Sequence, residues 1–184
     1  MIFTELALKG AFLIEPERLE DERGFFARTF CMQEFTHHGL NPRVAQCSVS
    51  YNRRRGTLRG LHYQASPSEE AKLVYCTAGA AFHVIVDIRS SSPTFKRWLA
   101  VELSADNHRM LYIPEGFAHG FQTLEDHTEL FYQMSKEYDP QAERGIRWDD
   151  SDLAIEWPAA PPRAISSRDL QLPTIATLDL GLGR

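Results

Sequence analysis

The sequence predicts an all-β protein, folded as a jelly-roll barrel or sandwich with short helices and an irregular C-terminal arm. Two observations support this fold class. Helix signals are weak throughout, and short runs rich in β-branched and aromatic residues recur with turn residues between them. These runs cover residues 45–52, 57–64, 72–77, 81–88, 98–103, 109–113, 120–123 and 129–134. Eight or more strands of this length suit a jelly roll.

The segment before these strands contains fewer regular elements. A short apolar strand is expected at residues 11–14, followed by an acidic turn and the stretch DERGFFARTF at residues 21–30. The one fair helix candidate is residues 32–38, because Gly39 can end it and Asn41-Pro42 follows.

The composition changes after Tyr138, where tryptophans and a proline cluster replace the strand pattern. We expect a single domain over residues 1–184, with a core at about 11–135. Residues 136–184 then form an arm that packs on the barrel and carries one helical turn at 166–170. Within that turn Ser166 is a plausible N-cap and Asp169 its capping-box partner.

Composition and charge exclude several functional classes. The chain has 20 basic and 25 acidic residues, a net charge of −5, so neither nucleic acid nor an anionic membrane is an expected partner. No apolar run is long enough to span a bilayer, and the first residues lack the features of a signal peptide, which predicts a cytoplasmic location. Cys31, Cys47 and Cys76 follow no metal-ligand pattern and are expected to be reduced thiols.

The run GTLRGLHYQ at residues 56–64 holds an arginine and a histidine that could bind an anion and act as a base. In a regular strand, Leu58 and His62 would share one face and Arg59 would lie on the other. Gly60 permits a bulge, which would let Arg59 and His62 converge. The simpler alternative is a strand with one satisfied histidine and one solvated arginine.

Two further strands carry polar side chains at inward positions. Lys72 opens the strand KLVYCT, where an inward lysine would need a partner or a task, although a lysine at a strand end commonly reaches solvent. Tyr132 shares a strand face with Leu130 and Met134 and is expected to point inside. A buried tyrosine is usually a core residue with one bonded hydroxyl, so the case for chemistry depends on these groups converging.

The segment IPEGFAHGF at residues 113–121 has the order P-x-G-x-x-H and ends with His119. This order resembles the second motif of the cupin superfamily, whose histidine binds a metal in many members. A metal site would need three good ligands, and His62, His83 and His119 are the candidates. A metal-dependent cupin, such as an isomerase or a dioxygenase, is therefore an alternative hypothesis.

Nearly the whole chain resembles the dTDP-4-dehydrorhamnose 3,5-epimerase family. The resemblance is carried by DERGFF (21–26), GTLRGLHYQ (56–64), KLV (72–74), VDIRSSSPTF (86–95), IPEGFAHGF (113–121), ELFYQ (129–133) and the final WP followed by SSRD (166–169). It implies a homodimeric jelly-roll enzyme without a cofactor or a metal. Such an enzyme epimerises the carbons beside the ketone of a nucleotide-linked 4-keto-6-deoxyhexose.

The resemblance also implies roles for individual residues. His62 corresponds to the base, Asp169 to the carboxylate that orients it, Lys72 to the group that stabilises the enolate oxygen, and Tyr132 to the donor that returns a proton from the opposite face. Residues matching substrate-binding positions are Arg23, Phe26, Gln46, Arg59, His83, His119, Glu143 and Arg168. Guanidinium groups such as Arg23 and Arg59 suit a diphosphate.

Several positions depart from the family pattern. His83 stands where the family commonly has aspartate, Arg28 where it often has glutamate, and Gln46-Cys47-Ser48 replaces its usual Q-x-N. An imidazole in place of a carboxylate changes the charge around Lys72 and His62. Inversion at C3 alone, a different nucleotide, or a binding module without turnover are therefore alternatives.

Overall fold

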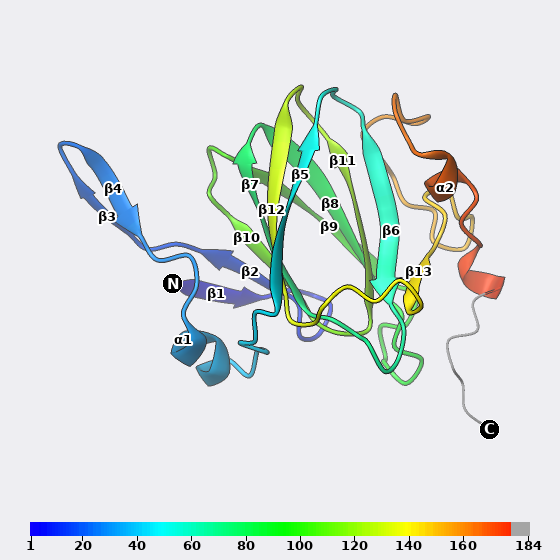
Figure 1. Ribbon diagram of the computed structural model, residues 1–184, viewed down its shortest axis with the longest axis horizontal. Helices are drawn as coiled ribbons and strands as arrows, with labels where there is room; N and C mark the ends of the chain where they lie inside the picture. The colour runs from blue at the N-terminus through cyan, green and yellow to red at the C-terminus, as the bar shows by residue number, and fades with distance from the viewer. Residues whose placement is uncertain (178–184) are drawn as a thin grey trace.

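Two antiparallel sheets lie face to face in the computed structural model, which describes residues 1–177 (Figure 1). One sheet has the order β1 (Ile2–Glu5), β2 (Phe12–Glu15), β10 (Met110–Ile113), β7 (Lys72–Ala78), β12 (Thr128–Met134) and β5 (Gln46–Asn52). The other has the order β13 (Glu143–Gly145), β6 (Leu58–Gln64), β11 (Phe117–Thr123), β8 (Ala80–Asp87) and β9 (Trp98–Ser104). The predicted all-β sandwich is confirmed.

The main core fills the space between the sheets. Alternate residues of each strand point inward, as the period of two requires, so Val74 and Cys76 of β7 meet Ile85 of β8 and Leu130 of β12. All four are at most 5% exposed. Full burial of each such aliphatic side chain contributes on the order of 2 kcal/mol.

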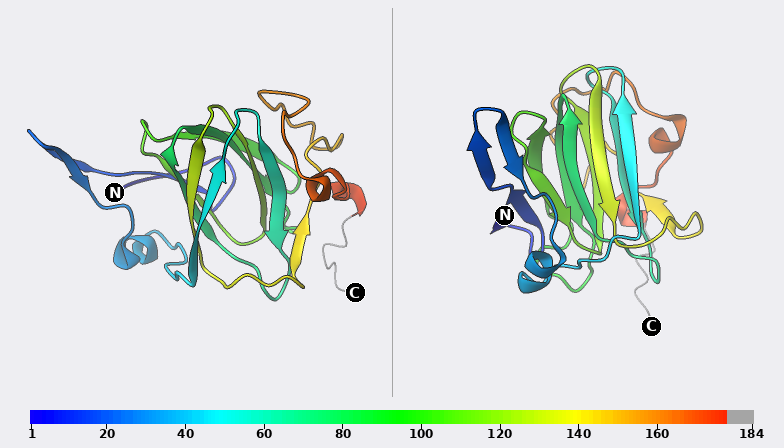
Figure 2. Two further views of the ribbon diagram at one scale, coloured as in Figure 1. Left: turned by 45° about the horizontal axis from the view of Figure 1, so that its top comes forward. Right: turned by 60° about the vertical axis from the view of Figure 1, so that its left-hand side comes forward.

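The C-terminal arm covers the outer face of the five-stranded sheet (Figure 2). Ile146, Trp157 and Ile175 of the arm pack in one cluster with Leu61 of β6 and its neighbours. The arm contains the short helix α2 (Ser167–Leu170) and the 3-10 turn η1 (Ile175–Thr177). Ser166 caps α2, since its Oγ accepts from the backbone N–H of Asp169 at 3.0 Å.

Four strands were absent from the sequence-based prediction. They are β1, β13 and the two strands of a hairpin, β3 (Arg18–Asp21) and β4 (Gly24–Ala27), which projects away from the sandwich on the left of Figure 1. Each has only three or four residues, too few for an alternation pattern, and the hairpin is charged and largely exposed. The expected helix near residue 32 is α1 (Met32–His37). Within residues 1–177, no helix is both long and apolar enough to cross a membrane.

A bulge at Gly60 changes the inward-facing set of residues along β6. Its pairing with β11 joins His62 to His119 but Arg59 to Phe121, so the register shifts between them. Leu58 and Leu61 therefore belong to the cluster under the arm, while Arg59 and His62 both reach the space between the sheets. The expected convergence of Arg59 and His62 is confirmed, and Leu58 does not share a face with His62 as it would in a regular strand.

The bulge brings two glycines into contact. At φ +113°, Gly60 occupies a conformation that side chains rarely adopt, and a Cβ there would lie 2.6 Å from the Cα of Gly120. A Cβ on Gly120 would in turn lie 2.9 Å from the carbonyl oxygen of Arg59. Only glycine at both positions allows β6 and β11 to approach this closely.

Candidate active site

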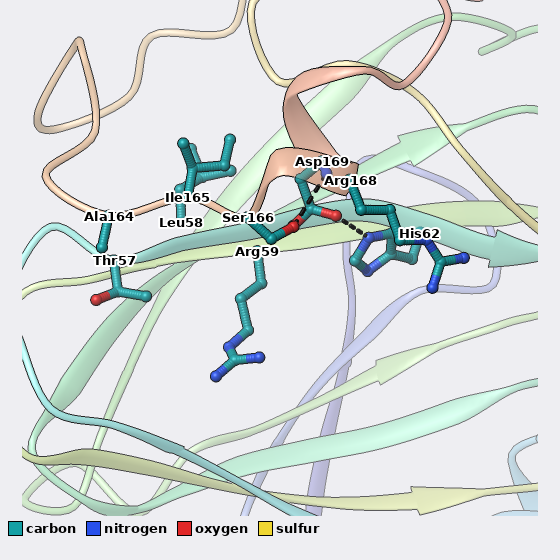
Figure 3. Close-up of a pocket in the computed structure, with 9 residues that line it drawn as sticks. All are labelled: Thr57, Leu58, Arg59, His62, Ala164, Ile165, Ser166, Arg168 and Asp169. Atoms are coloured by element: carbon teal, nitrogen blue, oxygen red, sulfur yellow. Dashed lines mark hydrogen bonds and ion pairs between the residues drawn. The ribbon is translucent and has the colours of Figure 1, made fainter.

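Two cavities meet at Arg59 and His62. The first, about 250 Å³, lies between the sheets and is lined by Ser48, Val49, Ser50, Arg59, His62, Lys72, His119, Phe121 and Tyr132. The second, about 360 Å³, lies between β6 and the C-terminal arm and is lined by Thr57, Leu58, Arg59, His62, Ala164, Ile165, Ser166, Arg168 and Asp169 (Figure 3). Together they have the size and mixed polarity of a small-molecule site.

A histidine and a carboxylate form a pair where the cavities join. His62 Nε2 and Asp169 Oδ1 are 2.8 Å apart (Figure 3). Asp169 Oδ2 accepts from the backbone N–H of Gly60 at 3.2 Å. Burial alone would raise the pKa of Asp169, but the hydrogen bonds from His62 and Gly60 outweigh it and hold that pKa below its usual value. The ionised carboxylate fixes the orientation of the imidazole and leaves Nδ1 as its free nitrogen.

Lys72 points into the cavity between the sheets and has a carboxylate partner. Its Nζ lies 3.1 Å from Glu70 Oε1, and both side chains are largely buried. Register places Lys72 opposite Met134 of β12, two residues beyond Tyr132. A fixed cation is thus available on the six-stranded sheet, facing the histidines of the other sheet.

Three residues make up what we call the floor: His119 and Tyr132 line the inner end of this cavity, and His83 lies behind His119. His83 is fully buried and His119 is 5% exposed. His83 Nδ1 lies 3.0 Å from His119 Nε2, and burial lowers the pKa of His83 to about 3. Burial, reinforced by the neighbouring His83, Lys72 and His62, also holds the pKa of His119 well below its usual value. Both imidazoles are therefore neutral at physiological pH.

The floor does not form a metal site. Among residues 1–177, no group of three or more His, Cys, Asp or Glu side chains is arranged to hold a metal ion. His83 and His119 instead use one nitrogen each to bond to one another, and His62 bonds to Asp169. The three-histidine alternative from the sequence therefore lacks its donor set.

Tyr132 faces the histidines from the opposite sheet. Its ring centroid lies 6.1 Å from that of His119, and burial raises its pKa, partly offset by the charge of Arg59. It belongs to β12 of the six-stranded sheet, whereas His62 belongs to β6 of the five-stranded sheet. A flat molecule held between the sheets would have one group on each of its faces.

The outer end of the site, which we call the rim, consists of His62, Asp169, Glu143 and Arg168. Arg168 Nη2 lies 2.6 Å from Glu143 Oε2, which also accepts from the Tyr138 hydroxyl. Glu143 is on β13, next to β6, and its pKa is lowered because the bonds from Arg168 and Tyr138 outweigh the effect of burial. Arg59 and Arg168 thus supply two guanidinium groups to the cavity under the arm.

Three predicted site residues lie elsewhere in this chain. Arg23 pairs with Asp21 at the tip of the β3–β4 hairpin, and Phe26 on the same hairpin is 72% exposed. Gln46 begins β5, and its Oε1 accepts from the backbone N–H of Tyr138 at 2.9 Å. None of the three lines either cavity.

Other residues of the site were missed in the sequence. Glu70 pairs with Lys72, and Asn52 Oδ1 accepts from Arg59 Nε at 2.9 Å. The acidic pair Glu69-Glu70 just before the strand of Lys72 was a usable signal. Asn52 and the cavity-lining Ser50 of β5 had no signal beyond ordinary polarity.

Known proteins share this sequence and fold. A family model described as dTDP-4-dehydrorhamnose 3,5-epimerase matches residues 5–177. An enzyme of that name from Shigella flexneri is 45% identical, covering 92% of both chains.

Two solved structures also match. A dTDP-6-deoxy-D-glucose-3,5-epimerase from Legionella pneumophila in complex with dTDP-4-keto-L-rhamnose has a TM-score of 0.91 and 37% identity, covering 98% of this chain and 95% of that one. A 3′-monoepimerase from Streptomyces bikiniensis in complex with dTDP-quinovose has a TM-score of 0.86 and 36% identity, covering 94% and 87%. The chain therefore belongs to the dTDP-4-dehydrorhamnose 3,5-epimerase family of isomerases.

Proposed function

We propose that this family member inverts C3 and C5 of a dTDP-linked 4-keto-6-deoxyhexose through an enolate, with His62 as the base and Tyr132 as the acid. The observation that carries the proposal is the placement of these two groups on opposite sheets with one cavity between them. Inversion at a carbon requires a proton acceptor and a proton donor on opposite faces of a planar intermediate.

Each inversion proceeds in two steps. His62 removes the proton from a carbon beside the C4 ketone, and the electron pair of that C–H bond moves into the ring as the ketone oxygen becomes an enolate oxygen. Lys72 and His119 stabilise this oxygen by charge and hydrogen bonding. Tyr132 then returns a proton to the carbon from the other face, and solvent resets both groups. The product is an isomer, so the electron count is unchanged.

The cavity beneath the arm suits the nucleotide diphosphate. Arg59 reaches both cavities and Arg168 lies at the rim, so two guanidinium groups can bind phosphate oxygens while the sugar extends between the sheets. The Legionella relative, which was solved with a dTDP-linked keto sugar, supports the same ligand class for this chain.

We also propose that the active form is a homodimer in which the β3–β4 hairpin contacts a second copy. The hairpin projects from the sandwich, and its exposed residues include Leu19, Phe25 and Phe26. Exposed apolar side chains on a projecting element are typical of an interface. Arg23 and Phe26 would then contribute to the partner's site. Light scattering after gel filtration should give twice the mass of 21.0 kDa, and a monomer that is fully active would contradict this arrangement.

Proton NMR in deuterium oxide tests the reaction directly. With dTDP-4-keto-6-deoxyglucose, the C3 and C5 proton signals should both disappear as deuterium replaces them. Loss of the C3 signal alone would make the protein a 3-epimerase, an activity for which the similar Streptomyces monoepimerase is a precedent. Absence of exchange at either carbon would contradict the proposed function.

A further inference from the structure

His83 makes no contact with either cavity, yet it holds the histidine that does. Its imidazole is fully buried behind His119, and Phe121 lies 5.6 Å away between ring centroids. His83 Nδ1 and His119 Nε2 are 3.0 Å apart, the planes of the rings differ by 5°, and the ring centroids are 5.3 Å apart. That centroid separation is about the N···N distance plus the two ring radii. The rings are therefore edge to edge in one plane, the geometry of a linear hydrogen bond and not of a stack.

The other nitrogen of each ring has a different environment. Of the described residues, His83 Nε2 is one of two buried side-chain polar atoms that have no hydrogen-bond partner. In the described part of the chain His119 Nδ1 has no hydrogen-bond partner, and it is not among those buried atoms, so it is open to the cavity that His119 lines. The pair thus has one end sealed in the core and one end at the substrate.

Two neutral arrangements of protons fit this geometry. If His119 Nε2 donates, His83 must carry its proton on Nε2, which leaves a buried N–H without an acceptor, and His119 presents a bare Nδ1 to the cavity. If His83 Nδ1 donates, the unpaired buried atom is a bare nitrogen, and His119 carries its proton on Nδ1. Orphaned buried N–H groups are rarer than under-satisfied acceptors.

The charges around the pair do not oppose the second arrangement. The titratable groups facing His119 are Lys72 of β7, His62 and Arg59 of β6, Tyr132 of β12 and His83 of β8. The core cluster also contains the Cys76 thiol of β7. The ammonium of Lys72 already has Glu70 as its acceptor, and Asp169 is bonded to His62. Within residues 1–177, no carboxylate lies within hydrogen-bond distance of either imidazole of the pair to turn it into a cation.

We propose that His83 is a positioning residue that fixes His119 as a neutral hydrogen-bond donor, with its proton on Nδ1 directed at the substrate's ketone oxygen. The contact with substrate rests on the proposed function, whereas the hydrogen bond between the histidines does not. A neutral donor stabilises the enolate oxygen without first gaining a proton from solvent. Its contribution is therefore independent of pH wherever the protein is folded.

Nitrogen NMR of the wild-type protein tests the arrangement without any variant. In long-range ¹H–¹⁵N spectra of histidine-labelled protein, protonated and bare imidazole nitrogens have distinct shifts, and His119→Gln identifies the signals of His119. We expect a protonated Nδ1 and a bare Nε2, unchanged between pH 6 and pH 8. A protonated Nε2, or titration of His119 within that range, would overturn the proposal. Deuterium exchange into the sugar is measured separately, so a protein with the expected tautomer but no exchange would refute the function and leave the hydrogen bond standing.

A matched pair of variants tests the consequence for catalysis. The side chain of His83→Asn can still donate to His119 Nε2, whereas that of His83→Asp at neutral pH can only accept, so His119 must then hold a proton on Nε2. In His83→Asp the carboxylate also raises the pKa of His119. As pH rises through that value, the cavity-facing Nδ1 loses its proton.

We therefore expect kcat of His83→Asp to gain a new fall of about tenfold or more toward high pH, with little change in KM. His83→Asn should show no such fall of kcat toward high pH, and His119 in this variant should keep its wild-type ¹⁵N chemical shifts. Equal pH profiles for the two variants would contradict the positioning role, since a merely structural residue predicts a similar loss in both.

Discussion

His62 and His119 are direct partners in the register of β6 and β11, yet they have opposite surroundings. His62, at the rim, has a side chain that is 32% exposed and has an ionised carboxylate as its partner. His119, on the floor, is 5% exposed and has another neutral imidazole as its partner. A base that must exchange protons with solvent needs solvent exposure and a nearby opposite charge. A hydrogen-bond donor that must stay neutral needs burial away from water. One pair of neighbouring strands provides both environments.

Removal of His62, the histidine of the rim, should give the largest decrease in kcat. We expect His62→Ala to lower kcat by about 10³-fold to 10⁴-fold, because the variant lacks the imidazole that accepts the proton. Tyr132→Phe should lower epimerisation comparably, but proton exchange on the His62 face should persist. Chiral analysis of the product together with deuterium uptake separates the two variants. If Tyr132→Phe still inverts the carbon, the division of roles between the sheets is wrong.

The carboxylate of the rim should matter nearly as much as the imidazole. Asp169→Asn is expected to lower kcat by about 10²-fold or more, because the amide cannot stabilise the imidazolium and can present an N–H where the ring nitrogen needs an acceptor. Asp169→Glu keeps the charge and serves as the control for geometry. An Asp169→Asn variant with wild-type kcat would show that exposure alone, without a counter-charge, suffices for the base.

We expect the buried histidines of the floor to make the free energy of unfolding depend on pH. The pKa of His83 is lowered from 6.5 to about 3 in the folded protein, so below pH 6.5 the unfolded chain binds a proton that the folded chain does not. Stability is then fully present above pH 6.5 and decreases as pH falls toward 3. As pH falls from 7 to 5, this histidine should lower the free energy of unfolding by about 2 kcal/mol.

Urea unfolding at the two pH values measures that loss. His119, whose pKa is lowered in the same direction, adds to it. The His83→Asn variant should lose less stability over this interval than the wild type does. Identical losses in the two proteins would mean that His83 is not the neutral buried base described here.

The smallest effect is expected for the exposed ion pair of the rim. Arg168 is 60% exposed in its side chain and bonds to Glu143, so Arg168→Ala should change the free energy of unfolding by less than about 1 kcal/mol. KM for the nucleotide sugar should rise and its dependence on salt should weaken, because a phosphate partner is lost. Calorimetry and kinetics at two ionic strengths check this, with Arg147→Ala, whose guanidinium pairs with Asp149 outside both cavities, as the matched control.

The contrast between rim and floor also marks what the sequence could predict. Alternation along its strand was enough to place Tyr132 inside but left Lys72 open between an inward position and solvent. Gly60 was enough to suggest the bulge that brings Arg59 to the side of His62. The bond between His83 and His119 depends on the register of β8 against β11, which joins His83 to Phe121, and no local pattern specifies such a register. The hairpin that carries Arg23 was missed because its strands are short and exposed, so that they bury too little to leave a pattern.

The contact between Gly60 and Gly120 also sets how freely this sequence can vary. Any side chain at either position would meet backbone atoms within 3 Å, and backbone cannot move aside as a flexible side chain can. In an exhaustive library of single substitutions, we expect both positions to tolerate glycine alone. The spacing between His62 and His119 therefore depends on Gly60 and Gly120, two residues that have no side chain.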